Sequence, residues 1–292
     1  MEGILYALVP MVAWGSIGFI SNKIGGTPNQ QTFGMTIGAL FFALGVWLIV
    51  KPQLSLILWV FGIIGGILWA IGQSGQFHAM QYMGVSVANP LSSGAQLVVG
   101  SLIGALIFNE WTQPIQFVLG IVALILLLIG FYFSSRRDSD NPLLKQSQHR
   151  LSDFYKGFRA LFYSTIGYLS YTILFNNIMS FSALSVILPM AVGMLLGSLI
   201  LMKFQVALTE SVFKNSFVGI LWGIGNIFML FAAAKAGLAI AFSFSQLGII
   251  ISIAGGILFL GEVKTKKELG WLFIGLLCFI IGAVLLGIVK SY

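Results

Sequence analysis

The sequence predicts an all-α polytopic membrane protein with ten transmembrane helices, arranged as two inverted five-helix repeats. Of its 292 residues, 58% are hydrophobic and only 8% are charged, whereas a soluble domain carries about 25% charged residues. Its apolar runs are about 20 residues long, the length that crosses a bilayer as a helix. The octet GILWAIGQ at 66–73 returns as GILWGIGN at 219–226, which indicates an internal repeat.

Each apolar run is expected to be a helix, because barrel strands alternate with period two and are about half as long. The first run is not expected to be a cleaved signal, since Glu2 is its only early charge and no basic segment precedes it. The single cysteine, Cys278, excludes an intramolecular disulfide. The expected helices cover 3–22, 31–50, 54–78, 85–108, 112–133, 158–178, 182–203, 213–234, 238–260 and 268–289.

A polar stretch divides these runs into five and five. It predicts a first repeat over 1–133, a cytoplasmic linker over 134–157 and a second repeat over 158–292. Because five is odd, the second copy must enter the membrane from the opposite side, as in the inverted repeats of transporters. Besides the octets, the halves share Gln96 and Gln246, FNE (108–110) and LGE (260–262), and the GxxxG pairs Gly34/Gly38 and Gly193/Gly197, at offsets of 150 to 159.

The net charge of +7 is explained by membrane topology, so no nucleic-acid partner is expected. Twelve of the 15 Lys and Arg residues fall on one set of alternating loops, and positively charged loops stay cytoplasmic. This places both termini outside the cell. The twelve are Lys23, Arg136, Arg137, Lys145, Arg150, Lys156, Arg159, Lys203, Lys214, Lys264, Lys266 and Lys267.

Polar side chains on the repeated helices are the candidate binding residues. In the third run Trp69, Gln73 and Gln76 are spaced i, i+4 and i+7 and share a face, and Trp222 and Asn226 repeat this spacing in the eighth run. A buried amide must find a partner. Interhelical bonding is the simpler role for a lone Gln, but a Trp–amide pair on symmetry-related helices favours a shared cavity.

The fourth and ninth runs add polar groups near the bilayer midplane, where transporters hold substrate. Pro90 can break the fourth helix and free backbone carbonyls. Tyr168 and Tyr171 of the sixth run are assigned to packing. The predicted substrate-binding residues are Trp14, Trp69, Gln73, Gln76, Asn89, Ser92, Gln96, Trp222, Asn226, Ser245 and Gln246.

The predicted cavity has no charged side chain, which limits its substrate. A phosphate would need Arg or Lys, and a cation would need a carboxylate or an aromatic cage. Amides offer both donors and acceptors, which suits the paired hydroxyls of a neutral monosaccharide, and an indole can cover a pyranose face. No P-loop, metal-ligand cluster or Ser/His/Asp set is found, so neither an enzyme nor a metal or other cofactor is expected.

Five segments carry a family resemblance over essentially the full chain: WAIGQ (69–73), ANPLSSGAQLVVG (88–100), WGIGN (222–226), FSFSQL (242–247) and LGE (260–262). They resemble the glucose/ribose porter family of the drug/metabolite transporter superfamily. The resemblance implies the two-times-five inverted repeat and proton-driven uptake of glucose, or a related monosaccharide, across a bacterial plasma membrane. It assigns the site to Trp69, Gln73, Trp222 and Asn226, together with Gln96 and Gln246.

Proton coupling is the part with no obvious residue, because no carboxylate lies at the midplane. Glu110, Glu262 and His78 are the candidates, and the two carboxyls would need desolvation to bind a proton near neutral pH. For Glu262, pairing with the lysines that follow it is the simpler interpretation. Facilitated diffusion therefore stays open.

Two other functions stay open. One is export of amino acids or small hydrophobic metabolites and drugs, and the other is a non-transporting membrane scaffold or receptor. A monomer in the lipid bilayer is favoured over a dimer, because the GxxxG pairs are expected to pack within one chain.

Overall fold

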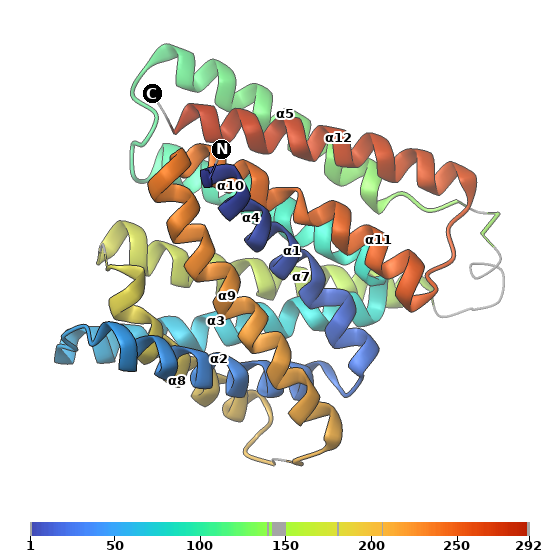
Figure 1. Ribbon diagram of the computed structural model, residues 1–292. Coiled ribbons are helices and arrows are strands. Elements are labelled where there is room, and N and C mark those ends of the chain that lie inside the picture. Colours follow the sequence, from blue (N-terminus) through green and yellow to red (C-terminus); the bar gives the residue numbers. More distant parts are fainter. Residues whose placement is uncertain (1, 139, 142–149, 180, 206, 291–292) are drawn as a thin grey trace. The chain divides into compact units, whose positions relative to one another are not determined.

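A computed structural model describes residues 2–138, 140–141, 150–179, 181–205 and 207–290. Helices form all the regular structure of these residues, and every predicted apolar run overlaps at least one of them. The elements are α1 (Glu2–Ile24), α2 (Pro28–Val50), α3 (Leu56–Met83), α4 (Val85–Leu106), α5 (Pro114–Ser135), α7 (Arg150–Ile173), the π-helix η1 (Leu174–Ile178), α8 (Ala183–Leu201), α9 (Glu210–Ala236), α10 (Leu238–Gln246), α11 (Gly248–Leu260) and α12 (Lys266–Val289) (Figure 1).

Eight segments of the described chain are long and apolar enough to cross a membrane. They are α1, α2, α3, α5, α8, α9, α12 and the segment Ile240–Leu260 that joins α10 to α11. The predicted fourth and sixth spans are helical as α4 and α7 but more polar, since α4 carries Asn89, Ser92 and Gln96 and α7 begins in the charged linker. The all-helical class is confirmed, and the number of ten spans stays a prediction.

The predicted break at Pro90 is wrong, because α4 runs unbroken from Val85 to Leu106 with the proline inside it. Pro90 lies in the second turn of the helix, where one missing backbone donor leaves the later turns intact. The interruption lies in the ninth run instead. There the N–H of Leu247 bonds to the carbonyl of Phe244 at 3.1 Å, between α10 and α11.

The chain folds into two compact units, and each unit draws on both halves of the sequence. Unit 1 comprises Met1–Phe19, Tyr82–Gly157 and Ile224–Tyr292; unit 2 comprises Ile20–Gln81 and Phe158–Gly223. In unit 1, α5 and α12 lie side by side (Figure 1). A core around them contains Ala123, Leu127, Ile249, Phe279 and Leu286.

Unit 2 is held together by helix contacts that only glycine permits. A Cβ atom at Gly38 of α2 would lie 1.7 Å from the carbonyl oxygen of Ser216 on α9. A Cβ atom at Gly193 of α8 would lie 2.2 Å from the carbonyl oxygen of Ile63 on α3. Such close backbone approach is how helices associate in lipid, where no hydrophobic effect drives them together.

These two helix pairs make equivalent contacts at constant sequence offsets. Gly219 of α9 approaches Met35, Gly38 and Ala39, whereas Gly66 of α3 approaches the residues 155 positions further on, Met190, Gly193 and Met194. Gly219 and Gly66 are themselves 153 residues apart. The sequence aligned Gly34/Gly38 with Gly193/Gly197, at an offset of 159. The contacts instead make Gly38 the counterpart of Gly193, at an offset of 155, so the alignment of these two glycine pairs was wrong by about one helical turn.

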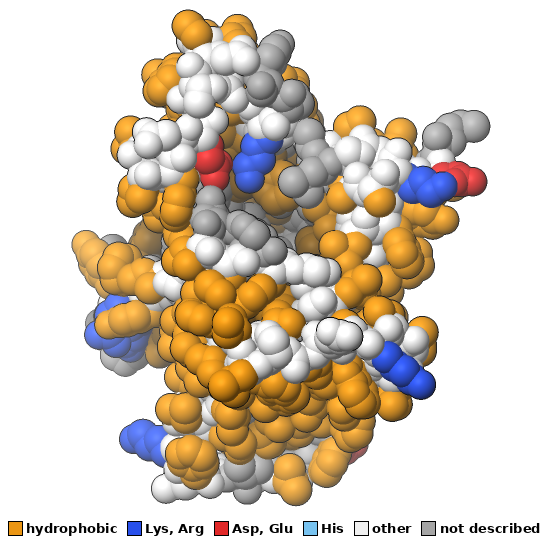
Figure 2. Space-filling model, turned by 90° about the vertical axis from the view of Figure 1, so that its left-hand side faces the viewer, with side chains coloured by type: hydrophobic (Ala, Val, Ile, Leu, Met, Phe, Trp, Pro, Cys, Tyr) orange, Lys and Arg blue, Asp and Glu red, His pale blue; other side chains and the backbone are white. Residues whose placement is uncertain are grey.

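Large apolar side chains cover the outside of the helices. Ile49 is 84% exposed, Leu56 79% and Leu106 73%. The face in Figure 2 carries mostly hydrophobic side chains, with few Lys, Arg, Asp or Glu among them. An exposed apolar surface of this extent is suited to lipid rather than to water.

Candidate functional site

Three aromatic side chains of unit 2 meet in its interior, and two of them, Trp69 and Trp222, are predicted binding residues. The rings of Trp69 and Trp222 have centroids 5.3 Å apart, and the ring of Tyr168 lies edge-on to Trp69 at 6.2 Å. Trp69 is 2% exposed and the other two are 8% exposed. With Gln73 and Gln76 these residues form what we call the aromatic–amide cluster.

Two carboxamides of the cluster converge on one hydroxyl group. The Tyr168 hydroxyl donates toward Oε1 of Gln73 at 2.8 Å and lies 3.0 Å from Oε1 of Gln76. The Gln73 side chain is buried, and its Nε2 lies 3.5 Å from Gln76 Oε1. The cluster thus binds a hydroxyl with neutral amides, and its five residues carry no formal charge.

Gly72 of α3 allows Tyr168 to pack close to these amides. A Cβ atom at Gly72 would lie 2.8 Å from Cδ1 of Tyr168, so α7 packs directly on this side of α3. The Ser164 hydroxyl donates to the carbonyl oxygen of Gly72 at 2.7 Å and fixes the register of the two helices. The sequence assigned Tyr168 to packing, because a tyrosine in an apolar run looks the same in either role.

Two further polar residues follow Gln73 along α3. The Ser74 hydroxyl, next to Gln73, donates to Oδ1 of Asn29 at 2.8 Å. His78, one turn further along, has Nδ1 at 2.8 Å from the Ser74 carbonyl oxygen. The predicted proton candidate His78 is therefore hydrogen-bonded to its own helix.

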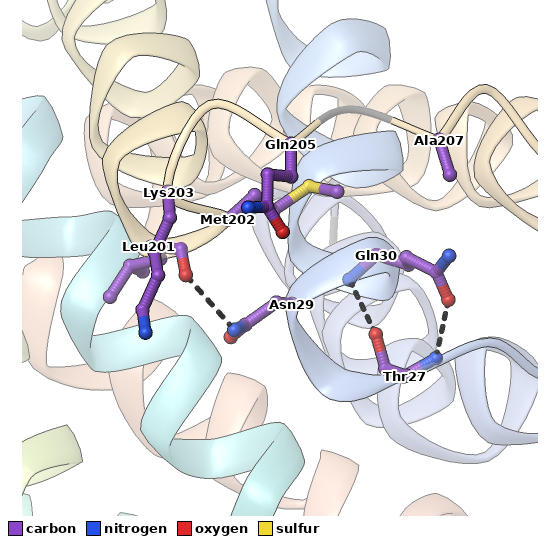
Figure 3. A pocket seen from close by; sticks show the side chains of 8 residues that line it. All are labelled: Thr27, Asn29, Gln30, Leu201, Met202, Lys203, Gln205 and Ala207. Carbon is purple, nitrogen blue, oxygen red and sulfur yellow. Dashed lines mark hydrogen bonds between the residues drawn. The ribbon is translucent and has the colours of Figure 1, made fainter.

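Asn29 also borders a groove of about 320 Å³ at the ends of α2 and α8. Its Nδ2 donates to the carbonyl oxygen of Leu201 at 3.2 Å, and Figure 3 shows Lys203 and Gln205 on the same groove. Asn29 thus joins the groove to Ser74, which is the neighbour of Gln73 in α3. The full lining is Thr27, Asn29, Gln30, Leu201, Met202, Lys203, Gln205 and Ala207.

The remaining predicted residues belong to unit 1, and Gln96, Ser92 and Ser245 bond within their own helices. Gln96 donates from Nε2 to the Ser92 hydroxyl at 3.1 Å, and the Ser245 hydroxyl donates to the carbonyl of Phe242 at 2.7 Å. Trp14 packs on Gly225, where a Cβ atom would lie 2.3 Å from the indole Nε1. The unit 1 set is Trp14, Asn89, Ser92, Gln96, Asn226, Ser245 and Gln246.

Glu262 binds the first turn of α4 rather than only its own loop. Its carboxylate accepts the N–H of Val85 at 2.5 Å, the N–H of Ser86 at 3.2 Å and the Ser86 hydroxyl. The predicted lysine partner is present but more distant, with Lys264 Nζ at 3.9 Å. The glutamate therefore acts mainly as a helix cap supplied from another part of unit 1.

Lys264 is a buried cation whose environment disfavours its charge. Its side chain is 5% exposed. Burial is the main cause that lowers the pKa of Lys264 to about 8, and Arg137 adds repulsion while Glu262 and Glu268 oppose the shift. The lysine is thus destabilising in its charged form.

Replacing Lys264 with methionine is expected to stabilise the protein below pH 8, by at most about 3 kcal/mol, because a buried charge is removed. Between pH 8 and 10.5 the unfolded chain binds more protons than the folded one, so wild-type stability rises there and the advantage of the variant shrinks. Thermal unfolding in detergent from pH 7 to 10 measures this. Parallel pH curves for Lys264→Met and wild type would contradict it.

Within the residues that the structure describes, no group of three or more His, Cys, Asp and Glu side chains could hold a metal ion. The chemistry available at the aromatic–amide cluster is hydrogen bonding and ring stacking by neutral groups.

Known proteins resemble this chain over nearly its whole length. Residues 5–289 match the family described as Sugar transport protein. Relatives named "Putative sugar uptake protein" are 70% identical in Streptococcus pyogenes serotype M6, 68% in Streptococcus agalactiae serotype V and 56% in Lactococcus lactis. These alignments cover 100% of this chain and at least 99% of each relative. A solved crystal structure at 12% identity covers 100% of this chain and 99% of its own, with a TM-score of 0.63; at this identity it is similar in fold alone.

Proposed function

Because the chain belongs to the sugar transport protein family and is a multi-pass membrane protein, we propose that it is a secondary transporter for uptake of a neutral monosaccharide, glucose first. The observation that carries this proposal is the aromatic–amide cluster. It holds two carboxamides, two indoles and a phenol in a buried setting without a formal charge.

The geometry of the cluster suits a sugar hydroxyl. Gln73 and Gln76 already direct their carboxamide oxygens at one hydroxyl, that of Tyr168. A sugar hydroxyl entering the cluster would find the same acceptors and the amide Nε2 donors. Trp69 and Trp222 supply apolar faces for the C–H groups of a pyranose. An anion or a cation would lose its hydration there without gaining an opposite charge.

Alternating access between two inverted five-helix repeats is part of this proposal. It is supported by the equivalent glycine contacts, in which Gly38 and Gly219 have counterparts in Gly193 and Gly66. The first repeat is assigned to 1–133, the linker to 134–157 and the second repeat to 158–292; linker residues 139 and 142–149 lie outside the described part of the chain. We place the monomeric protein in the bacterial plasma membrane, with both termini outside and within the drug/metabolite transporter superfamily.

Coupling to protons is proposed together with uptake. The candidates outside the cluster are Glu110, Glu262 and His78. Glu262 and His78 are held by the hydrogen bonds described above. A proton on the Glu262 carboxylate would have to replace one of the hydrogen bonds that it accepts, whereas the Nδ1–H of His78 can keep its bond to Ser74 when Nε2 takes up a proton. We therefore expect coupling through Glu262, but not through His78, to disturb the start of α4.

The proposal is tested with purified protein in proteoliposomes. Labelled glucose should enter in a saturable manner, be displaced by unlabelled monosaccharides, and enter faster when the outside is acidic. Uptake displaced by amino acids or hydrophobic dyes, and not by sugars, would favour the alternative of an exporter of such compounds. Absence of uptake of every class by folded protein would favour a scaffold or receptor.

A further inference from the structure

We propose that Glu110 caps the N-terminus of α10 in the same way that Glu262 caps α4, so that two carboxylates anchor the two helices that carry most of the predicted binding residues of unit 1. The observed half of this arrangement is the set of bonds from Val85 and Ser86 to Glu262. The inferred half involves the backbone N–H groups of Leu238 and Ala239.

Each of the two glutamates follows its helix through a turn that is closed by an equivalent backbone hydrogen bond. The N–H of Glu262 bonds to the carbonyl of Gly256 at 3.1 Å, and that of Glu110 bonds to the carbonyl of Gly104 at 3.0 Å. The residue before each glutamate is left-handed, with φ of 68° at Gly261 and 52° at Asn109. In both places the N–H of the glutamate reaches the carbonyl six residues earlier, across a left-handed residue. Gly261 directly follows α11, whereas Ile107 and Phe108 lie between α4 and Asn109.

Each carboxylate lies over a glycine of its own helix. A Cβ atom at Gly256 would lie 2.9 Å from Oε1 of Glu262, and one at Gly104 would lie 2.6 Å from Oε2 of Glu110. Gly256 follows Gly104 by 152 residues, and Glu262 follows Glu110 by the same number. The side chains of the two glutamates therefore leave their turns in matching directions.

The helices that would receive these carboxylates begin alike. Gly84 precedes α4 with φ 82° and ψ 157°, and Gly237 precedes α10 with φ 86° and ψ 150°. A glycine has no side chain that could cap the helix it precedes, so the first N–H groups need an acceptor from elsewhere. At α4 this acceptor is Glu262, and the position equivalent to Ser86 by the offset of these glycines is Ala239.

The functional consequence rests on the proposed transport function. α4 carries Asn89, Ser92 and Gln96, and the segment that α10 begins carries Ser245 and Gln246. Glu110 and Glu262 are then positioning residues, which hold these helices by their N-terminal ends. On the predicted topology the two caps lie at opposite faces of the membrane.

The experiment cross-links the inferred contact. In a Cys278→Ser background with a protease site inserted in the linker, the pair Glu110→Cys and Ala239→Cys is treated with a short bifunctional thiol reagent and cleaved. The two fragments are expected to stay joined on a denaturing gel. Glu262→Cys with Ser86→Cys is the positive control, and Glu110→Cys with Ser243→Cys, about one turn away, is the control for specificity.

Separate fragments for the Glu110 and Ala239 pair, with joined fragments for the Glu262 and Ser86 pair, would overturn the inference. This result does not depend on sugar transport, so failure of the transport proposal would be seen separately.

In transport assays Glu110→Gln and Glu262→Gln should each raise the KM for sugar several-fold with a smaller change in maximal rate. The exposed Glu2→Gln should change neither. An unchanged KM in Glu110→Gln would contradict the positioning role.

Discussion

Replacing Gln73 with alanine is expected to raise the KM for sugar uptake by about 10- to 100-fold. The substitution removes a buried carboxamide that contacts the Tyr168 hydroxyl at 2.8 Å and that we assign to a sugar hydroxyl. A buried hydrogen-bonding group left without its partner costs about 1–3 kcal/mol, and 1.4 kcal/mol corresponds to a factor of ten. Initial rates over a range of glucose concentrations in proteoliposomes measure the effect.

The matched control is Gln53→Ala, which removes the same side chain from an exposed position in the loop before α3. Its KM should equal that of wild type. Thermal unfolding of both variants in detergent separates a loss of binding from a loss of folded protein. Wild-type saturation behaviour in folded Gln73→Ala would remove Gln73 from the site.

Replacing Gly38 with alanine is expected to destabilise the protein by about 3 kcal/mol or more, because overpacking of a close contact forces the backbone to move. The added Cβ atom would lie 1.7 Å from a backbone carbonyl oxygen, and α2 and α9 would have to separate. Gly193→Ala should have a similar effect on α8 and α3, since it occupies the equivalent contact at 2.2 Å. The fraction of protein that stays monodisperse on heating in detergent reports both.

The control on the same helix is Gly45→Ala, which would meet no atom within 4 Å. It should be neutral, or stabilising by up to about 1 kcal/mol, since alanine is the better helix former. Equal stability of Gly38→Ala and Gly45→Ala would show that α2 and α9 do not pack as described. A large loss in Gly38→Ala without one in Gly193→Ala would contradict the equivalence of the two helix pairs.

The sequence was most informative where a local pattern determines the result. Helical spacing placed Trp69, Gln73 and Gln76 on one face, and the repeated octet pointed to Trp222; the structure brings these residues into the aromatic–amide cluster. Asn226 shares α9 with Trp222 but falls in the other unit. The role of Tyr168 could not be inferred, since its two amide partners are more than 90 residues away in the chain.

Non-local partners also explain the other differences. The lysines next to Glu262 suggested a local ion pair. The Glu262 carboxylate instead accepts hydrogen bonds mainly from backbone N–H groups more than 170 residues earlier in the chain. The two GxxxG pairs correctly predicted close helix contacts within the chain. Their alignment with each other was wrong by one helical turn, because a GxxxG motif gives the spacing of small residues in one helix and does not identify the residues they contact on another. The groove beside Asn29 lies between the start of α2, the end of α8 and the loop that follows α8, and the sequence offers no periodic signal for such a loop.

The most direct measurement is counterflow of labelled glucose in proteoliposomes that are preloaded with unlabelled glucose. Exchange through a neutral binding site predicts that the labelled sugar accumulates transiently inside. At a sugar concentration near the wild-type KM, Gln73→Ala should strongly reduce this accumulation, while Gln53→Ala should retain it. Folded wild-type protein that gives no counterflow with glucose, ribose or any other neutral monosaccharide would contradict the assignment of the aromatic–amide cluster as a sugar site.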